Sequence, residues 1–231
     1  MLLADPCFVR IDCSMPVQIV NESVERYMRS LLARHDEPVL LEMEKLAAVK
    51  NFPIINRHVG VTVSILARSI GARRIFELGS GFGYSAYWFA KAAGPDGEVH
   101  CTDGDSANEK MARRFLTQAN LWDRILFHVS DAVTALNNTT GQYDIVYNDI
   151  DKHGYPDAWL ASRDRVRPGG FYICDNVLWS GRVAETSGKD DAMVDWTNAI
   201  KEHNKMIAAD EDYVSSILPI RDGVMLAYRL K

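Results

Sequence analysis

Acidic and amide side chains gather in two short stretches, Asn-Asp-Ile-Asp-Lys at 148–152 and Asp-Asn at 175–176. Each stretch follows a short, largely apolar run of the kind that forms a buried strand. If the two strands are neighbours, Asp149, Asp175 and Asn176 converge on one point. Two carboxylates and one amide oxygen make a hard, oxygen-rich partial shell that suits Mg²⁺, Mn²⁺ or Ca²⁺. Each residue alone could be a turn former or a helix cap, but their conjunction indicates a divalent-metal site.

Lys152 adjoins this acidic cluster and is the candidate catalytic residue. A lysine near a divalent ion is pushed toward its neutral form, in which it can accept a proton. The alternative is a surface lysine that only neutralises the neighbouring acids. Without a cation, carboxylates at such close range would repel each other, and one would tend to stay protonated.

A glycine-rich turn, Glu-Leu-Gly-Ser-Gly-Phe-Gly at 77–83, forms a second candidate site. Glycines between a strand and a helix permit tight dihedral angles and close approach of the backbone to a ligand. The dinucleotide fingerprint needs its third glycine three places after the second, and Tyr84 occupies that position. Glu77 also places an anion where a pyrophosphate would approach. The turn therefore favours a different nucleoside ligand, one that carries positive charge.

Two further acids follow the next two predicted strands. Asp103, 20 residues after Gly83, can accept hydrogen bonds from both ribose hydroxyls. Its alternative role is a polar turn with Gly104 and Asp105. Asp131 could bind an adenine amine, and it fits equally well as a helix N-cap.

Regular alternation of short apolar runs and helical-period stretches must position these residues. The predicted strands are 75–78, 99–102, 125–129, 143–147 and 170–174, and the intervening predicted helices are 84–93, 108–119, 132–136 and 157–166. Such alternation predicts an α/β fold, a doubly wound parallel sheet with helices on both faces. Ligands in these sheets bind beyond the carboxyl ends of the strands, where the candidate residues fall.

The two ends of the chain depart from this pattern. Residues 1–70 are mostly helical, with helices predicted at 23–34, 38–50 and 58–70. After a helix at 193–208, strands at 213–218 and 224–229 are joined by a turn with Asp222-Gly223. A hairpin cannot be parallel, so one of these strands must run against the sheet. We predict a single domain over 1–231, with a helical N-terminal extension (1–70) and a core (71–231).

Composition limits the function classes. The chain has 231 residues, 47% of them hydrophobic, and a formal net charge of −5. Basic runs such as Arg73-Arg74 are short, which argues weakly against nucleic acid, because phosphate binding needs a clustered basic surface. The N-terminus lacks the pattern of a signal peptide, and no apolar stretch is long enough to span a bilayer. We therefore expect a cytoplasmic protein without a membrane partner.

The four cysteines do not indicate a zinc site, because there is no CxxC pair and no histidine cluster beside them. Cys101 and Cys174 lie in apolar runs and are expected in the core. Cys7 and Cys13 could pair, but without a secretory signal reduced thiols are expected.

Together these segments resemble the cation-dependent class I O-methyltransferases, the group that contains catechol and caffeoyl-CoA O-methyltransferases. The similarity runs from about Ser23 to the C-terminus. The matching stretches are 76–85, 148–152, 175–181 and 218–224, of which Asp-Asn-x-Leu-Trp-x-Gly at 175–181 is the most specific. The sequence departs at Asn56-Arg57-His58, where the plant enzymes usually carry small and acidic residues. This departure leaves the acceptor open.

The resemblance implies a Rossmann-like, seven-stranded sheet with an antiparallel last strand, S-adenosylmethionine as cofactor, and a homodimer. It implies metal ligation by Asp149, Asp175 and Asn176, with Mg²⁺ the first choice, and a base role for Lys152. The residues expected to contact the cofactor are Ile55, Glu77, Gly79, Ser80, Ser85, Asp103, Asp131, Ala132, Asp149 and Asp151.

The expected reaction transfers the sulfonium methyl group to a hydroxyl of a catechol-like or other vicinal-diol phenol by in-line displacement. Trp179 could form an aromatic wall for the acceptor ring, or serve as a core anchor at the base of its loop. Rival functions are a nicotinamide-dependent oxidoreductase, a non-catalytic S-adenosylmethionine-binding interaction protein and a tRNA methyltransferase. Tyr84 argues against the first, the intact acid, amide and lysine set against the second, and the acidic balance against the third.

Overall fold

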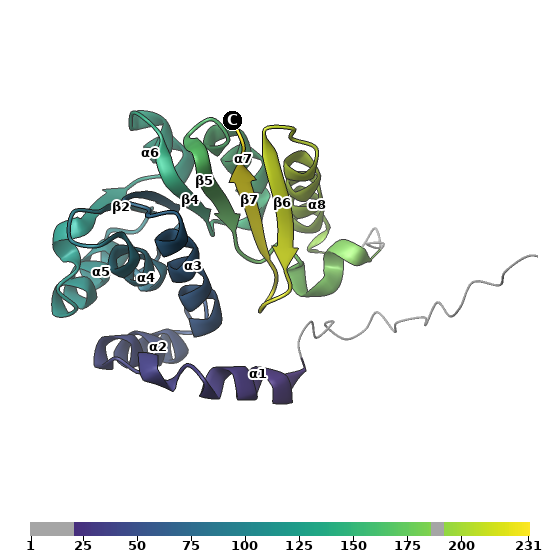
Figure 1. Ribbon diagram of the computed structural model, residues 1–231. Coiled ribbons are helices and arrows are strands. Elements are labelled where there is room, and N and C mark those ends of the chain that lie inside the picture. Colours follow the sequence, from purple (N-terminus) through teal and green to yellow (C-terminus); the bar gives the residue numbers. More distant parts are fainter. Residues whose placement is uncertain (1–20, 186–191) are drawn as a thin grey trace, which may run out of the picture.

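A seven-stranded sheet separates two layers of helices in the computed structural model, which describes residues 21–185 and 192–231 (Figure 1). The strand order is β3-β2-β1-β4-β5-β7-β6. The strands are β1 (Arg74–Leu78), β2 (Glu98–Asp103), β3 (Ile125–Val129), β4 (Tyr143–Asn148), β5 (Val166–Cys174), β6 (Tyr213–Leu218) and β7 (Val224–Arg229). β7 is antiparallel to both of its neighbours, and the pairs from β3 across to β5 are parallel. The predicted fold with its reversed last strand is confirmed.

The helices cover both faces of the sheet. Those beside β1, β2 and β3 on one face are α3 (Arg57–Ser69), α4 (Tyr84–Ala93) and α5 (Ser106–Gln118), and those on the other are α6 (Ala132–Asn138), α7 (Tyr155–Ser162) and α8 (Val194–Ala208). Short 3₁₀ turns at Ala33–His35, Trp122–Arg124, Lys152–Gly154 and Trp179–Ala184 complete the elements. No helix of the described residues is both long and apolar enough to cross a membrane.

The N-terminal extension consists of α1 (Glu22–Ser30), α2 (Pro38–Lys50) and α3, and in Figure 1 α1 and α2 lie below the sheet. α2 belongs to the main core, because Leu40 and Met43 are fully buried in the same cluster as α4. α1 buries none of its residues, and its predicted apolar face (Val24, Tyr27, Leu31) is exposed. The first 20 residues of the predicted extension, with Cys7 and Cys13, lie outside the described residues. That the chain forms one domain stays a prediction.

Most element boundaries follow the sequence pattern closely, but three differ by four residues: α1 ends at Ser30 and not at 34, β5 begins at Val166 and not at 170, and α7 ends early. The helix predicted at 157–166 is wrong at its end, since α7 finishes at Ser162. Val166 already pairs with Tyr143 in the sheet, and the Arg165 N–H closes the turn on the Ser162 carbonyl at 2.8 Å. Strand pairing therefore overrides the helical period. Cys101 and Cys174 are free and buried, as expected.

Register brings three strand ends level with one another. Leu78 at the end of β1 pairs with Asn148 of β4, and Asn148 pairs with Cys174 of β5. Asp149 and Asp175 are therefore the next residues along adjacent strands. Their backbone N–H groups extend the same ladder, to the carbonyls of Leu78 at 2.9 Å and Asn148 at 3.1 Å.

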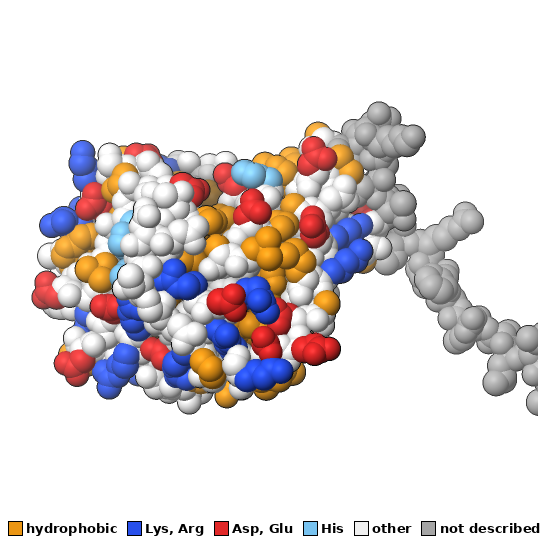
Figure 2. Space-filling view, turned by 90° about the horizontal axis from the view of Figure 1, so that it is seen from above, with side chains coloured by type: hydrophobic (Ala, Val, Ile, Leu, Met, Phe, Trp, Pro, Cys, Tyr) orange, Lys and Arg blue, Asp and Glu red, His pale blue; other side chains and the backbone are white. Residues whose placement is uncertain are grey.

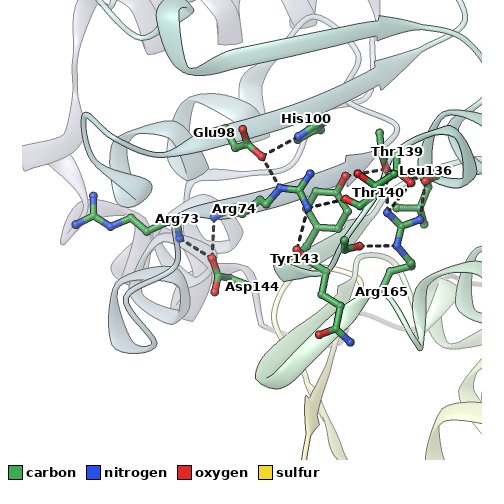
Figure 3. Close-up of polar contacts among 12 residues, drawn as sticks. Arg73, Arg74, Glu98, His100, Leu136, Thr139, Thr140, Tyr143, Asp144 and Arg165 are labelled. Carbon is green, nitrogen blue, oxygen red and sulfur yellow. Dashed lines mark hydrogen bonds and ion pairs between the residues drawn. The ribbon is translucent and has the colours of Figure 1, made fainter.

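The opposite end of the sheet is held by arginines. Figure 3 shows the N–H groups of Arg73 and Arg74 converging on Asp144, each at 2.7 Å, while the Arg74 guanidinium reaches Glu98. Arg74 also lies over the Tyr143 ring, 4.3 Å from its centroid. The Arg73-Arg74 pair thus joins β1 to β2 and β4.

Charges of both signs are mixed on the face that includes this end. Figure 2 views the molecule from the end opposite α1 and α2, and there basic and acidic side chains are interspersed. Elsewhere Arg114 pairs with Glu42 at 2.6 Å, and Arg113 lies 4.6 Å from the Trp122 ring centroid. Both arginines are therefore engaged within the protein.

Replacing Asp144 by Ala tests this anchoring. Burial would raise the pKa of Asp144, but the N–H groups of Arg74 and Arg73 and the Arg167 guanidinium lower it below its usual value. Asp144→Ala should lower the free energy of unfolding by about 1–3 kcal/mol at neutral pH. Because the folded-state pKa is depressed, this contribution should fade as the pH falls through it.

The matched control is Asp96→Ala. Asp96 also faces Arg73, but at 3.9 Å and with its side chain 88% exposed, so its loss should cost little. Urea unfolding of both variants measures the difference. Equal losses would contradict the anchoring role of Asp144.

Candidate functional site

A cavity of about 1050 Å³ opens beyond the carboxyl ends of the parallel strands. The predicted site residues that line it are Ile55, Gly79, Ser80, Ser85, Asp103, Asp131, Ala132, Asp149, Asp151, Lys152, Asn176 and Trp179. Glu77 and Asp175, both fully buried, belong to the strand ends that border it. The structure therefore brings the predicted residues of five different strand ends to one place, as expected at the switch point of a doubly wound sheet.

The glycine-rich turn has the backbone that its sequence predicts. Gly79, Gly81 and Gly83 have φ of 83°, 49° and 88°, a region that favours glycine. A Cβ at Gly79 would lie only 2.7 Å from the Asp149 carbonyl oxygen. The Ser80 N–H donates to the Thr102 carbonyl at 2.7 Å. The turn is thereby fixed against β2 and close to the end of β4.

Glu77 is a buried carboxylate without a hydrogen-bond partner among the described residues, and this holds for both of its oxygens. Burial raises its pKa to about 7, an effect that the nearby Ser85 and Ser80 hydroxyls partly offset and the charge of Asp149 reinforces. An unpaired buried carboxylate is costly unless a cation or donors satisfy it. The environment of Glu77 therefore suits a positively charged ligand group.

Asp103 and Asp131 line the cavity and also have the structural roles given as their alternatives, a polar turn for Asp103 and a helix N-cap for Asp131. One oxygen of Asp103 accepts from the Asp105 N–H at 2.7 Å and from the Asn108 amide at 3.1 Å. Asp131 caps α6 by accepting a hydrogen bond from the Thr134 N–H at 2.8 Å, and this bond is the main reason that the pKa of Asp131 is lowered. These bonds orient both carboxyl groups on the cavity wall.

Asp149, Asp175 and Asn176 are the oxygen-bearing residues at the ends of β4 and β5. Burial, and then the charge of Asp175, raises the pKa of Asp149, while Lys152 and Arg221 oppose the shift. The Oδ1 atom of Asp175 is buried with no partner in the part of the chain that the structure describes. Asn176 has φ of 58°, which asparagine tolerates better than most residues. Among the described residues no three His, Cys, Asp or Glu side chains form a group that could hold a metal ion.

Lys152 lies inside this cluster and not on the open surface, since its side chain is 13% exposed. Its Nζ donates to Tyr155 Oη at 2.7 Å and Asn176 Oδ1 at 2.9 Å, and lies 3.4 Å from Asp149 Oδ1. Tyr155 in turn donates to the Asp175 carbonyl at 2.8 Å. The lysine is thus oriented by two of the candidate metal ligands and by a buried phenol.

Sequence reasoning missed Arg221. It lies in the turn between β6 and β7, donates to Asp175 Oδ2 at 2.5 Å and to the Ile54 carbonyl at 3.0 Å, and lines the cavity. Arg221 lies within the stretch 218–224, which resembles the family. However, no local sequence pattern predicts that this turn folds back onto β5. Tyr155 was missed for the same reason.

Trp179 lines the cavity beside a second tryptophan that was also missed, Trp196 of α8. Their ring centroids are 5.9 Å apart at an interplanar angle of 48°. Trp179, Ser180 and Gly181 all have positive φ. Positive φ at consecutive residues costs conformational free energy, and such strained backbone is typical of functional sites.

The unusual segment 56–58 is largely structural. Asn56 caps α3 by accepting from the Val59 N–H at 3.0 Å. The buried Arg57 pairs with Glu44 of α2 at 2.7 Å, and Glu44 accepts from the Tyr84 hydroxyl at 2.6 Å. A smaller cavity of about 570 Å³, lined partly by α1 and α2, meets the larger one at residues 52–55 and Arg221.

Comparisons with known proteins agree with this geometry. The O-methyltransferase family profile matches residues 31–230. A flavonoid 3',5'-methyltransferase from Vitis vinifera is 32% identical over 200 residues, which cover 82% of this chain and 83% of that protein. A catechol O-methyltransferase from Niastella koreensis is 26% identical over 218 residues, covering 90% and 97%.

A solved structure adds the likeness in three dimensions. An O-methyltransferase from Streptomyces achromogenes, involved in tomaymycin synthesis and solved in complex with S-adenosylmethionine, has a TM-score of 0.80 at 25% identity. The match covers 90% of this chain and 96% of that one. The chain therefore belongs to the O-methyltransferase family and is an O-methyltransferase of the caffeoyl-CoA and catechol type.

Proposed function

We propose that this enzyme transfers the methyl group of S-adenosylmethionine to one hydroxyl of a catechol-like or other vicinal-diol phenol, with the help of a divalent cation. The observation that carries the proposal is the convergence of Asp149, Lys152, Asp175 and Asn176 at two paired strand ends, beside the glycine-rich turn.

The residues fit the cofactor. S-adenosylmethionine supplies an activated methyl group on a sulfonium centre and carries an ammonium group. The buried carboxylate of Glu77, which has no hydrogen-bond partner among the described residues, suits such a cation. Asp103 and Asp131 stand on the cavity wall where a ribose and an adenine could be bound. Ile55, a buried residue of the cavity wall, would provide an apolar contact for the methionine part.

Glu77→Gln should weaken S-adenosylmethionine binding about tenfold, because it removes the charge but keeps the shape. The pKa of Glu77 near 7 gives a second signature. A cationic ligand prefers the carboxylate, so wild-type affinity should rise between about pH 6 and pH 8, and that of the variant should stay flat. Calorimetry at several pH values measures both. An unchanged affinity in Glu77→Gln would remove Glu77 from the cofactor site.

The donor set also fits a hard divalent cation. Asp149, Asp175 and Asn176 would hold it. The Asp175 Oδ1 atom, buried and without a partner in the described part of the chain, would be stabilised most by a cation. When bound, such a cation lowers the pKa of a coordinated hydroxyl and fixes its direction. The chain itself must then orient the acceptor and take up the proton.

Lys152 is proposed as the base. Its four oxygen neighbours, Asp149, Ile150, Tyr155 and Asn176, hold its Nζ at the site. A divalent cation held by Asp149 and Asn176 would place further positive charge beside Nζ, the condition under which a lysine can accept a proton.

Trp179 and Trp196 are proposed to form one wall of the acceptor site. A centroid separation of 5.9 Å leaves no room for a ring between them, because two stacking gaps need about 7 Å. An aromatic acceptor would therefore lie against the pair and not within it.

Chelation tests the metal. Methyl transfer should be assayed over catechols, flavonoids and hydroxycinnamoyl thioesters, with and without excess chelator. We expect turnover of a vicinal diol to be lost in chelator and restored by Mg²⁺, and the matching monophenol to react poorly throughout. Full activity in chelator would refute the metal requirement.

Two variants distinguish whether Lys152 acts as a base or only contributes a positive charge. Lys152→Ala should lower kcat by about 10²–10⁴-fold with little change in cofactor affinity. Lys152→Arg keeps the positive charge but cannot give up a proton at neutral pH, so it should be similarly inactive. Substantial turnover in Lys152→Arg would assign the lysine an electrostatic role. The homodimer and the cytoplasmic location stay predictions.

A further inference from the structure

We propose that Arg221 is a built-in counter-cation of the candidate metal site, which keeps the affinity of that site for a divalent cation low. The inference rests on the proposed function, because it concerns the same ligands. It assigns a tuning role to a residue of the β6–β7 turn that contacts Asp175 directly.

Two hydrogen bonds hold the guanidinium group of Arg221 in place. One guanidinium nitrogen donates to Asp175 Oδ2 at 2.5 Å, and another donates to the Ile54 carbonyl at 3.0 Å. The Arg221 side chain is 28% exposed and that of Asp175 is fully buried. Such a pair lies largely out of water, where charges interact more strongly than on the surface.

The backbone gives an independent reason to assign Arg221 a role. Its φ is 50°, in the left-handed region, so backbone energetics alone would favour glycine at this position. A strained non-glycine residue persists where its side chain makes compensating contacts. Here those contacts are with Asp175 and with the segment that carries Ile55.

The four charges at the site are balanced before any ion binds. Lys152 donates to Asp149 and to Asn176, and Arg221 donates to Asp175. A divalent ion that binds these oxygens must share them with two cations and meets their repulsion. Asp175 can still offer Oδ1, which has no partner among the described residues. Arg221 therefore weakens the site without closing it.

Preorganisation by Arg221 would have the opposite effect, and the burial of Asp175 argues against it. The Asp175 side chain is already fully enclosed, so packing fixes its orientation. The guanidinium can add little order there, whereas its charge acts on the ion at short range. The repulsive effect should dominate.

Mn²⁺ binding to the full-length protein, measured by calorimetry, tests the proposal without relying on activity. Arg221→Gln removes the charge, and its Kd for Mn²⁺ should fall about tenfold or more relative to wild type. Arg221→Lys keeps the charge and should stay near wild type. Arg221→Gly suits the left-handed backbone and should also bind more tightly, which covers the case in which Arg221→Gln does not fold.

Thermal unfolding provides a second readout. Without metal, Arg221→Gln leaves Asp175 without its counter-ion, so Tm should fall below that of wild type. Saturating Mn²⁺ should then raise Tm more in the variant than in wild type, because tighter binding stabilises the folded state more. Adding Asp175→Asn to Arg221→Gln should abolish the gain and so place the ion at this site.

The outcomes distinguish this inference from the proposed function. Equal or weaker Mn²⁺ binding in the uncharged variants, with clear binding in wild type, would overturn the role of Arg221 and leave the metal site standing. No Mn²⁺ binding by any variant would overturn both.

Discussion

The parallel register of β1, β4 and β5 is the constraint on which the site depends. Leu78, Asn148 and Cys174 are paired across the three strands, so the residues that follow them lie at the same edge of the sheet. The N–H groups of Asp149 and Asp175 continue the ladder and fix the backbone just past each strand. A slip of one residue would turn every side chain of a strand to the other face. The acidic cluster would then be separated from the glycine-rich turn.

Charge compensation is the second condition that this arrangement imposes. Paired strand ends bring Asp149 and Asp175 together within a largely buried site, where like charges repel and water screens them only in part. Lys152 and Arg221 supply the opposite charge, one from the turn after β4 and one from the β6–β7 hairpin. The reversal of β7 matters for this reason, because it returns the chain to β5 with Arg221 at the connecting turn.

Local patterns predicted the elements well and the tertiary partners poorly. Short apolar runs and glycine turns are encoded within a few residues, so α4, β3, β6 and β7 have the predicted bounds. The end of α7 was wrong because Val166 pairs with Tyr143, a contact that helical periodicity does not contain. Arg221 is 46 residues from Asp175 along the chain, and nothing between them indicates the contact. Trp196 was missed likewise, because α8 reaches the cavity only through tertiary packing.

The predominance of acids around the cavity bears on which nucleoside ligand it can accept. Glu77, Asp103, Asp131 and Asp151 surround the glycine-rich turn, and Glu77 has no internal counter-ion among the described residues. A pyrophosphate would bring two negative charges to this wall, with Lys152 and Arg221 already engaged by the acidic pair.

S-adenosylmethionine would instead bring positive charge to the same carboxylates, on its sulfonium and ammonium groups. The glycine-rich turn by itself permits either kind of ligand, because it supplies only close backbone approach. Coulombic complementarity would therefore select the ligand class, and Glu77 at the end of β1, which has no partner among the described residues, would be stabilised most by a cationic ligand.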